Sequence, residues 1–469
     1  MVTEENGTSN LCMKDRVIPY SLAVCASVLR ENGINVQILD AMVENFTPNE
    51  TINRIERINP DILIIAVNIV AIDIDFIGFT ELKKKIKCKI VALINLPFVK
   101  EVMERYPIID VVIEREWAWA LLDVVKCFEE GGSLKEIKGI TFCQEGKLIE
   151  TPLRNHIHID NLPIPALDIL PMKKYHHYQI LTSVGCSHNC LFCHFGSYPR
   201  SGWEGKKIDK IIEELKLMKS YGNKYIRNMD NEFTLDIEYA KELCRRIISE
   251  KLNIIFDGNI RASNTDEELI ELLSKAGCVH VGFGCESGKQ KILDLNRKEL
   301  RLEEIIKTYK LLEKYKIPSK AYFLIGLFGD TRETIIETFE FITKKLKAKE
   351  ASFDIVIPYP GTGFYEYLKR KGWIDELTID NLIWIHKNVY NWNNLKHLQG
   401  EKPEWRVGEL TFDELLEIEK EYYPLIPHHG DRQKFKYWIL RGLIIQATKQ
   451  LISNPRANLN RMVRIILNK

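Results

Sequence analysis

The stretch Ile180-Leu-Thr-Ser-Val-Gly-Cys186-Ser-His-Asn-Cys190-Leu-Phe-Cys193 joins a short apolar strand pattern to three cysteines within eight residues. The cysteines have the spacing C-x3-C-x2-C and follow the predicted strand directly. Each iron of an iron–sulfide cube needs a ligand of its own, so three thiolates leave one iron open to an exchangeable molecule. The stretch therefore predicts an iron–sulfur centre with an open coordination position.

A structural zinc site completed by His188 or His194 is the alternative for the same residues. Paired C-x2-C units are the usual zinc signature, and the spacing here differs from it. The remaining eight cysteines are scattered among apolar or helical stretches, which favours small buried hydrophobic side chains in a reducing compartment. These are Cys12, Cys25, Cys88, Cys127, Cys143, Cys244, Cys278 and Cys285.

The whole-chain composition fits a multidomain enzyme. The 469 residues exceed one ordinary core, and 66 Lys and Arg against 65 Asp and Glu leave a formal charge of +1. No global field therefore favours nucleic acid or an anionic membrane. Residues 1–10 lack the apolar core of a secretory signal, and the apolar run 62–72 is too short to cross a bilayer. We expect a cytoplasmic protein.

Residues 1–150 alternate between helical and strand patterns, which predicts a Rossmann-like, doubly wound parallel sheet. Nothing before Tyr20 is a convincing strand, although this fold usually opens with one. The predicted strands are Val36–Asp40, Ile62–Val67, Ile90–Leu93 and Val111–Ile113.

Residues 151–175 are rich in proline and histidine and predict a linker. A second series of six strand–helix units follows over residues 176–373, which predicts a partial (β/α)6 TIM-like barrel. Residues 374–469 are predicted to form a helical extension. The six strands are expected at Ile180–Ser183, Tyr225–Asn228, Ile254–Asp257, Val279–Gly284, Lys320–Ile325 and Ser352–Ile357.

The cysteine loop, with Phe192 before its last cysteine, resembles the radical S-adenosylmethionine (SAM) superfamily. Later stretches resemble one branch of it, with an amino-terminal domain like a cobalamin-binding fold. That branch includes anaerobic magnesium-protoporphyrin ester cyclases and cobalamin-dependent carbon methyltransferases. The shared stretches are Asp230-Asn-Glu-Phe233-Thr234, Ala276-Gly277-Cys278, Gly282-Phe-Gly284-Cys-Glu286-Ser287-Gly288, Phe323-Leu-Ile-Gly326-Leu and Pro358-Tyr359-Pro360-Gly361-Thr362.

The resemblance implies that Cys186, Cys190 and Cys193 hold a [4Fe-4S] cluster. Its open iron would bind SAM and, on reduction, yield a 5′-deoxyadenosyl radical that abstracts hydrogen from an unactivated carbon. Methylation with cobalamin is the expected outcome. Alternatives are a cobalamin-independent cyclase or oxidoreductase with a vestigial first domain, and a non-enzymatic metal-binding or electron-transfer protein.

Several candidate cofactor-binding residues follow the predicted barrel strands, at the rim where catalytic groups converge. SAM carries a ribose diol, an amino group, a carboxylate and an adenine. We expect Glu286 and Ser287 to suit the ribose or amino group, Arg261 the carboxylate and Phe192 the adenine. The other candidates are Asp230, Gly326 and Tyr359. Phe328 and Asp330 depart from the family's Gly-Leu-Pro-Gly-Glu after Gly326.

Whether cobalamin binds stays open, because the family's glycine pair is replaced by Ile94-Asn95-Leu96-Pro97 and its acidic glycine turn by Glu114-Arg115-Glu116-Trp117. The stretch 432–469 carries nine Lys or Arg and no Asp or Glu. Such a basic amphipathic tail suits peripheral contact with anionic lipid, or covers the barrel. We expect a small-molecule or lipid-like substrate, an external electron donor and no nucleic acid.

Overall fold

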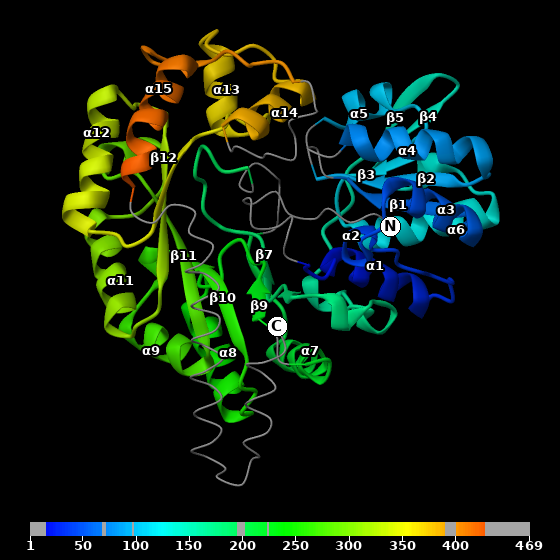
Figure 1. Ribbon diagram of the computed structural model, residues 1–469, viewed down its shortest axis with the longest axis horizontal. Helices are drawn as coiled ribbons and strands as arrows, with labels where there is room; N and C mark the ends of the chain where they lie inside the picture. The colour runs from blue at the N-terminus through cyan, green and yellow to red at the C-terminus, as the bar shows by residue number, and fades with distance from the viewer. Residues whose placement is uncertain are drawn as a thin grey trace. The chain divides into compact units, whose positions relative to one another are not determined.

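The computed structural model of the protein describes residues 16–67, 72–95, 98–194, 202–222, 225–389 and 400–426 (Figure 1). The described residues fall into two compact units. The first comprises those within 1–179, 191–206 and 357–416, and the second those within 180–190, 207–356 and 417–469. The predicted tail 432–469 lies outside the described residues.

The first unit contains a five-stranded sheet in the order β1-β2-β3-β4-β5. The first three strands pair in parallel, as predicted, and the last two add an antiparallel hairpin, so the sheet is mixed. The strands are β1 (Ile62–Ala66), β2 (Lys89–Leu93), β3 (Val111–Ile113), β4 (Ile140–Gln144) and β5 (Lys147–Glu150). The helices before residue 150 are α1 (Tyr20–Glu31), α2 (Ala41–Glu44), α3 (Pro48–Ile58), α4 (Ile72–Lys85), α5 (Val99–Arg105) and α6 (Trp117–Glu130).

The predicted strand Val36–Asp40 is wrong. These residues form a loop that leads into α2, because the Asp40 carboxylate accepts a hydrogen bond from the Val43 N–H, 3.0 Å away, and caps that helix. The same buried carboxylate accepts a 2.8 Å hydrogen bond from the Tyr175 hydroxyl. Asp40 therefore ends the extended segment as a helix cap.

The second sheet has the order β13-β12-β11-β10-β9-β6, and the five strands from β9 to β13 pair in parallel. The predicted strands are confirmed, except that the first is shifted towards the amino terminus. The strands of this sheet are β6 (His177–Ile180), β9 (Tyr225–Asn228), β10 (Ile255–Ile260), β11 (Cys278–Glu286), β12 (Ser319–Ile325) and β13 (Ala351–Ile355). The short strand β7 (Ser183–Val184) follows β6 and is not part of this sheet.

Helices alternate with these strands and cover the outer face of the sheet (Figure 1). In β12 the residues Ala321, Phe323 and Ile325 are buried, while those between them are less so, which is the alternation expected when helices cover one face. The carboxyl ends of the strands consequently share one edge. The helices are α7 (Ile208–Ser220), α8 (Ile237–Ser249), α9 (Glu267–Ala276), α10 (Gln290–Leu295), α11 (Leu302–Lys314) and α12 (Arg332–Glu340).

The chain also contains shorter elements outside the two large sheets. Trp405 and Phe412 stack with ring centroids 3.8 Å apart, which fixes the start of the last helix in the first unit. The elements are β8 (Glu204–Gly205), α13 (Gly363–Arg370), α14 (Ile379–Asn388), β14 (Arg406–Val407), β15 (Leu410–Thr411) and α15 (Phe412–Tyr422). Among the described residues, no helix has the length and apolar character needed to span a bilayer.

Candidate functional site

The three clustered cysteines differ from most of the others in their exposure. Cys186, Cys190 and Cys193 are half-buried, whereas Cys25, Cys88, Cys244, Cys278 and Cys285 are buried. Burial raises the pKa of the Cys244 thiol to about 12, so that thiol stays protonated and unreactive. In the described part of the chain, no three His, Cys, Asp or Glu side chains are already arranged to hold a metal ion. The ligand role of the three cysteines thus rests on their spacing and partial exposure, and it stays a prediction.

Asp230 anchors the start of the cysteine loop. Its side chain is 2% exposed, and Oδ1 accepts a 2.7 Å hydrogen bond from the Thr182 N–H. Oδ2 accepts a hydrogen bond from the Ser183 hydroxyl at 2.8 Å, and another from the Thr182 hydroxyl. Burial raises the pKa of Asp230, although these hydrogen bonds oppose the rise. Both oxygens are thus engaged by the segment that leads into Cys186.

Replacing Asp230 with alanine should destabilise the protein by about 3 kcal/mol, because it leaves a buried N–H and two hydroxyls without their acceptor. Anaerobic urea unfolding of the reconstituted protein measures the loss. Asp209→Ala is the control: its side chain is 84% exposed, so its pair with Arg246 should contribute less than about 1 kcal/mol. Equal losses in the two variants would contradict the anchoring role.

Glu286 ends β11 and forms a buried ion pair with Lys298. The backbone of Glu286 is left-handed, with φ of +63°, and the strand register shifts beside it. Its Oε1 lies 2.7 Å from Nζ of Lys298, and each side chain is 10% exposed. A Cβ on Gly284 would lie 2.2 Å from the same Oε1, so glycine is needed there to make room for the carboxylate.

Lys298 links this pair to the cysteine loop. Burial disfavours its charge, but the Glu286 carboxylate and the Cys190 thiolate favour it, and the pKa of Lys298 is raised as a result. The ammonium is therefore close enough to Cys190 to interact with it electrostatically. Lys298 was not predicted as a site residue.

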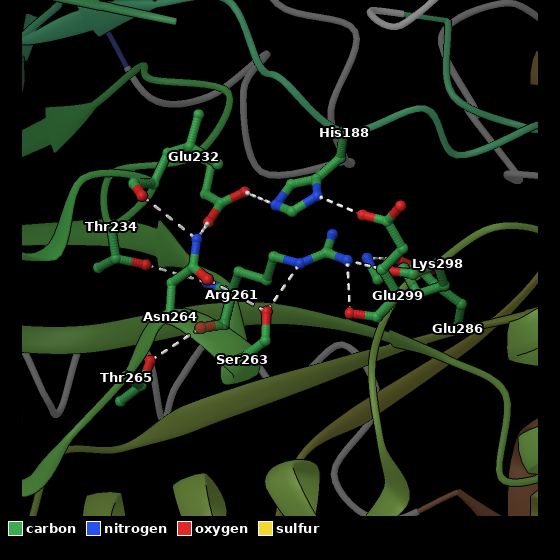
Figure 2. Close-up of polar contacts among 11 residues, drawn as sticks. His188, Glu232, Thr234, Arg261, Ser263, Asn264, Thr265, Glu286, Lys298 and Glu299 are labelled. Atoms are coloured by element: carbon green, nitrogen blue, oxygen red, sulfur yellow. Dashed lines mark hydrogen bonds and ion pairs between the residues drawn. The ribbon is translucent and has the colours of Figure 1, made fainter.

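Arg261, predicted to bind the SAM carboxylate, is 5% exposed and holds the turn that carries Lys298 (Figure 2). Its Nη2 donates hydrogen bonds to the carbonyl of Lys298 and, at 3.1 Å, to that of Glu299. Its Nε donates to the Ser263 hydroxyl at 2.9 Å. The guanidinium therefore fixes the backbone next to the Glu286–Lys298 pair.

His188, from the cysteine loop, lies between two carboxylates (Figure 2). Its Nδ1 is 3.1 Å from Oε2 of Glu299, and its Nε2 is 3.9 Å from Oε2 of Glu232. Burial lowers the pKa of His188, although Glu299 opposes the effect. Glu232 and Glu299 were not singled out from the sequence. Glu232 follows the end of β9, and that position was the signal that could have found it.

Gly326 and Ser287 lie in tightly packed connections. Gly326 follows β12 with φ of +78°, and in the next residues the Asp330 carboxylate accepts a 2.9 Å hydrogen bond from the Leu327 N–H. Ser287 is buried; its hydroxyl oxygen lies 3.1 Å from that of Thr338 and accepts a hydrogen bond from the Lys289 N–H. Asp330, which departs from the family pattern, thus closes the turn after Gly326 with its carboxylate.

Asp330 should make stability depend on pH. Burial raises its pKa to about 7, so folding favours the protonated form; its contribution is complete below about pH 4 and lost as the pH rises through 7. Asp330→Asn should therefore gain stability relative to the wild type between pH 5 and pH 8. Urea unfolding at both values measures the difference, and a constant difference would contradict the prediction.

In the first unit, the end of the cysteine loop packs against the start of α13. The Leu191 carbonyl accepts a 2.9 Å hydrogen bond from the Phe364 N–H, and Phe192 is half-buried. The ring centroids of His194 and Tyr359 are 5.3 Å apart. Burial raises the pKa of Tyr359 to about 12, so its hydroxyl stays protonated. Tyr359 therefore supports the segment that carries Cys193.

Comparisons with known proteins identify the family. The model of the radical SAM superfamily matches residues 180–342. An uncharacterized methyltransferase of Pyrococcus horikoshii is 30% identical over 429 residues, covering 88% of this chain and 91% of that protein. An anaerobic magnesium-protoporphyrin IX monomethyl ester cyclase of Rubrivivax gelatinosus is 25% identical over 75% of this chain, which spans 66% of the cyclase.

Among solved structures, the methyltransferase TsrM of Kitasatospora setae, with cobalamin and a [4Fe-4S] cluster bound, has a TM-score of 0.66 and 18% identity. The match covers 76% of this chain and 75% of TsrM, and shows that the two share an α/β fold. The family match falls on the second parallel sheet and contains the cysteine loop. The chain belongs to the radical SAM superfamily and is an enzyme whose cofactors are a [4Fe-4S] cluster and SAM.

Proposed function

We propose that this enzyme methylates an unactivated carbon of a small-molecule substrate. The observation that carries the proposal is the cysteine loop at the carboxyl edge of a parallel sheet, with three half-buried thiols, together with the buried Glu286–Lys298 pair at the end of β11. Methylation is preferred because the Pyrococcus horikoshii relative, whose match covers 88% of this chain, is named a methyltransferase. The cofactors supply the carbon radical, while the protein holds and shields them.

Cys186, Cys190 and Cys193 hold the cluster in this proposal. Their half-buried sulfurs suit a cluster added to the folded chain. We assign SAM contacts to Phe192, Glu286, Gly326 and Tyr359. We assign a supporting role at the same site to Arg261, Asp230 and Ser287, because their hydrogen bonds hold the backbone around it.

Cobalamin is the proposed carrier of the methyl group in the first unit. The main alternative to cobalamin-dependent methylation is a cobalamin-independent cyclase or oxidoreductase activity, and one observation favours that alternative. Glu116, in place of the family's glycine, has φ of +50° and places Oε1 2.9 Å from Nδ1 of His156. Side chains of this chain therefore fill part of the turn after β3, where the family has small residues.

We further propose the domain division made from the sequence, at residues 150, 175 and 373, with a Rossmann-like doubly wound first domain and a partial (β/α)6 barrel. Many thiols and an iron–sulfur cluster suit a reducing compartment, so we propose a cytoplasmic location. An external reductant supplies electrons. Contact with membrane or a lipid-like substrate would involve residues 432–469, outside the described part.

Product analysis after anaerobic reconstitution with iron, sulfide and hydroxocobalamin tests the proposal. Methylation predicts that the protein retains corrin absorbance after desalting and forms both 5′-deoxyadenosine and S-adenosylhomocysteine from SAM. Formation of 5′-deoxyadenosine alone, without retained corrin, would support the cyclase or oxidoreductase. Absence of both products despite a full cluster would contradict the proposed function and favour a binding or electron-transfer protein.

A further inference from the structure

We propose that His188 is a positioning residue that fixes the segment between Cys186 and Cys190 through its hydrogen bond to Glu299. The inference rests on the proposed ligand role of the cysteines. His188 stands two residues from each of Cys186 and Cys190, so its position constrains the backbone that carries both. Its task is to hold the loop ready for the cluster, without binding iron itself.

The orientation of the His188 ring is the first observation that supports this role. Nδ1 lies within hydrogen-bond distance of Oε2 of Glu299, at 3.1 Å, whereas Nε2 lies 3.9 Å from Oε2 of Glu232, too far for a hydrogen bond (Figure 2). The His188 side chain is 17% exposed, whereas that of Glu299 is 63% exposed, so the hydrogen bond joins a half-covered ring to a carboxylate at the surface. A histidine that completed a metal site would turn one nitrogen towards the thiols. The observed orientation favours a tether.

The Glu232 carboxylate and the Glu299 backbone are themselves held in place. Oε1 of Glu232 accepts a 3.1 Å hydrogen bond from the Asn264 side-chain amide. The backbone carbonyl of Glu299 accepts a hydrogen bond from Arg261, and Glu299 has a left-handed φ of +51° that a firmly held turn supports. Because Glu299 follows α10, the hydrogen bond connects the cysteine loop to a part of the second unit that is 111 residues away in the chain.

A tether in the middle of the loop complements the anchor at its start. Asp230 fixes Thr182 and Ser183, but these residues precede the first cysteine. The contact through His188 fixes the loop between two of its thiols. Restricting the loop before the cluster arrives reduces the entropy lost on binding, and such supporting contacts typically change metal affinity by about 10- to 100-fold.

His188→Ala should therefore lose its cluster to a ferrous chelator about tenfold faster than the reconstituted wild type, with an altered electron paramagnetic resonance (EPR) spectrum of the reduced cluster. His188→Gln retains a donor towards Glu299 and should recover part of the wild-type behaviour. Glu299→Leu should resemble His188→Ala, whereas Glu299→Gln keeps an acceptor and should be milder. His158→Ala, at a histidine with a 51% exposed side chain in the first unit, is the matched control.

A double-mutant cycle between His188→Ala and Glu299→Leu separates the tether from general damage. The tether predicts that the double variant loses its cluster no faster than either single variant, since both remove one interaction. Fully additive effects, or wild-type chelation rates and spectra in His188→Ala, would overturn the inference. If His188→Ala fails to fold, Glu299→Leu and Glu299→Gln test the tether instead, and equal cluster loss in these two variants would overturn it. Failure of the wild type to hold a cluster would instead overturn the proposed function.

Discussion

Serine in place of Cys190 should abolish 5′-deoxyadenosine formation and remove most of the iron from the reconstituted protein. A serine hydroxyl has a far higher pKa than a thiol and binds iron poorly in its neutral form. Cys190 also contributes to the electrostatic environment of the buried Lys298 ammonium. Iron and sulfide content, together with anaerobic product analysis, measures both losses.

The matched control for this substitution is Cys127→Ser. Cys127 is also half-buried but lies on α6, in the first unit, outside the cysteine loop. It should keep the wild-type iron content and activity. A Cys190→Ser protein with a full cluster and unchanged SAM cleavage would contradict the ligand assignment, and equal losses in both variants would indicate general damage.

Methionine in place of Lys298 should destabilise the protein by about 4 kcal/mol. The substitution leaves the Glu286 carboxylate buried without its cation, and breaking a buried pair typically costs about 3–5 kcal/mol. Both side chains are 10% exposed, so water offers little compensation. Anaerobic urea unfolding of the reconstituted protein measures the change, and a SAM-binding titration reports on the site.

The double variant Lys298→Met with Glu286→Gln should recover part of that stability, because it removes the uncompensated charge. Lys344→Met is the exposed control: its side chain is 70% exposed and pairs with Glu340 at 2.6 Å, which should contribute less than about 1 kcal/mol. A Lys298→Met protein no less stable than this control would contradict the buried pair.

The second sheet could be predicted closely, because β-branched runs separated by helical patterns occur at regular intervals. The strand Tyr225–Asn228 has the predicted bounds. Asp230 and Arg261 follow their strands and Glu286 ends its strand, all at the carboxyl edge, as expected. What each side chain contacts could not be predicted, because the partners are far apart in the chain.

Lys298 shows why the rest of the site was missed. In the sequence it stands within Arg297-Lys298-Glu299, a charged run typical of an exposed turn. Its burial follows from contacts with Glu286, 12 residues away, and from the hold of Arg261 on its carbonyl, 37 residues away. The pattern of neighbouring residues in the sequence cannot predict contacts between residues so far apart in the chain.

The first sheet shows a different kind of error. The hairpin formed by β4 and β5 was not predicted, although Glu145 and Gly146 both adopt positive φ, +52° and +75°, as a tight hairpin turn requires. Ile140-Thr141-Phe142 alternates in polarity shortly before the Glu145-Gly146 pair, so turn chemistry could have found the hairpin. The strand predicted at Val36–Asp40 failed for the converse reason, because a short run of apolar residues ended in a helix cap.

The EPR spectrum of the reduced, reconstituted enzyme before and after addition of SAM tests the central claim most directly. Three cysteine ligands leave one iron open to SAM. The account predicts about one [4Fe-4S] cluster per chain and a spectrum that changes when SAM binds. A full cluster whose spectrum does not respond to saturating SAM would contradict it.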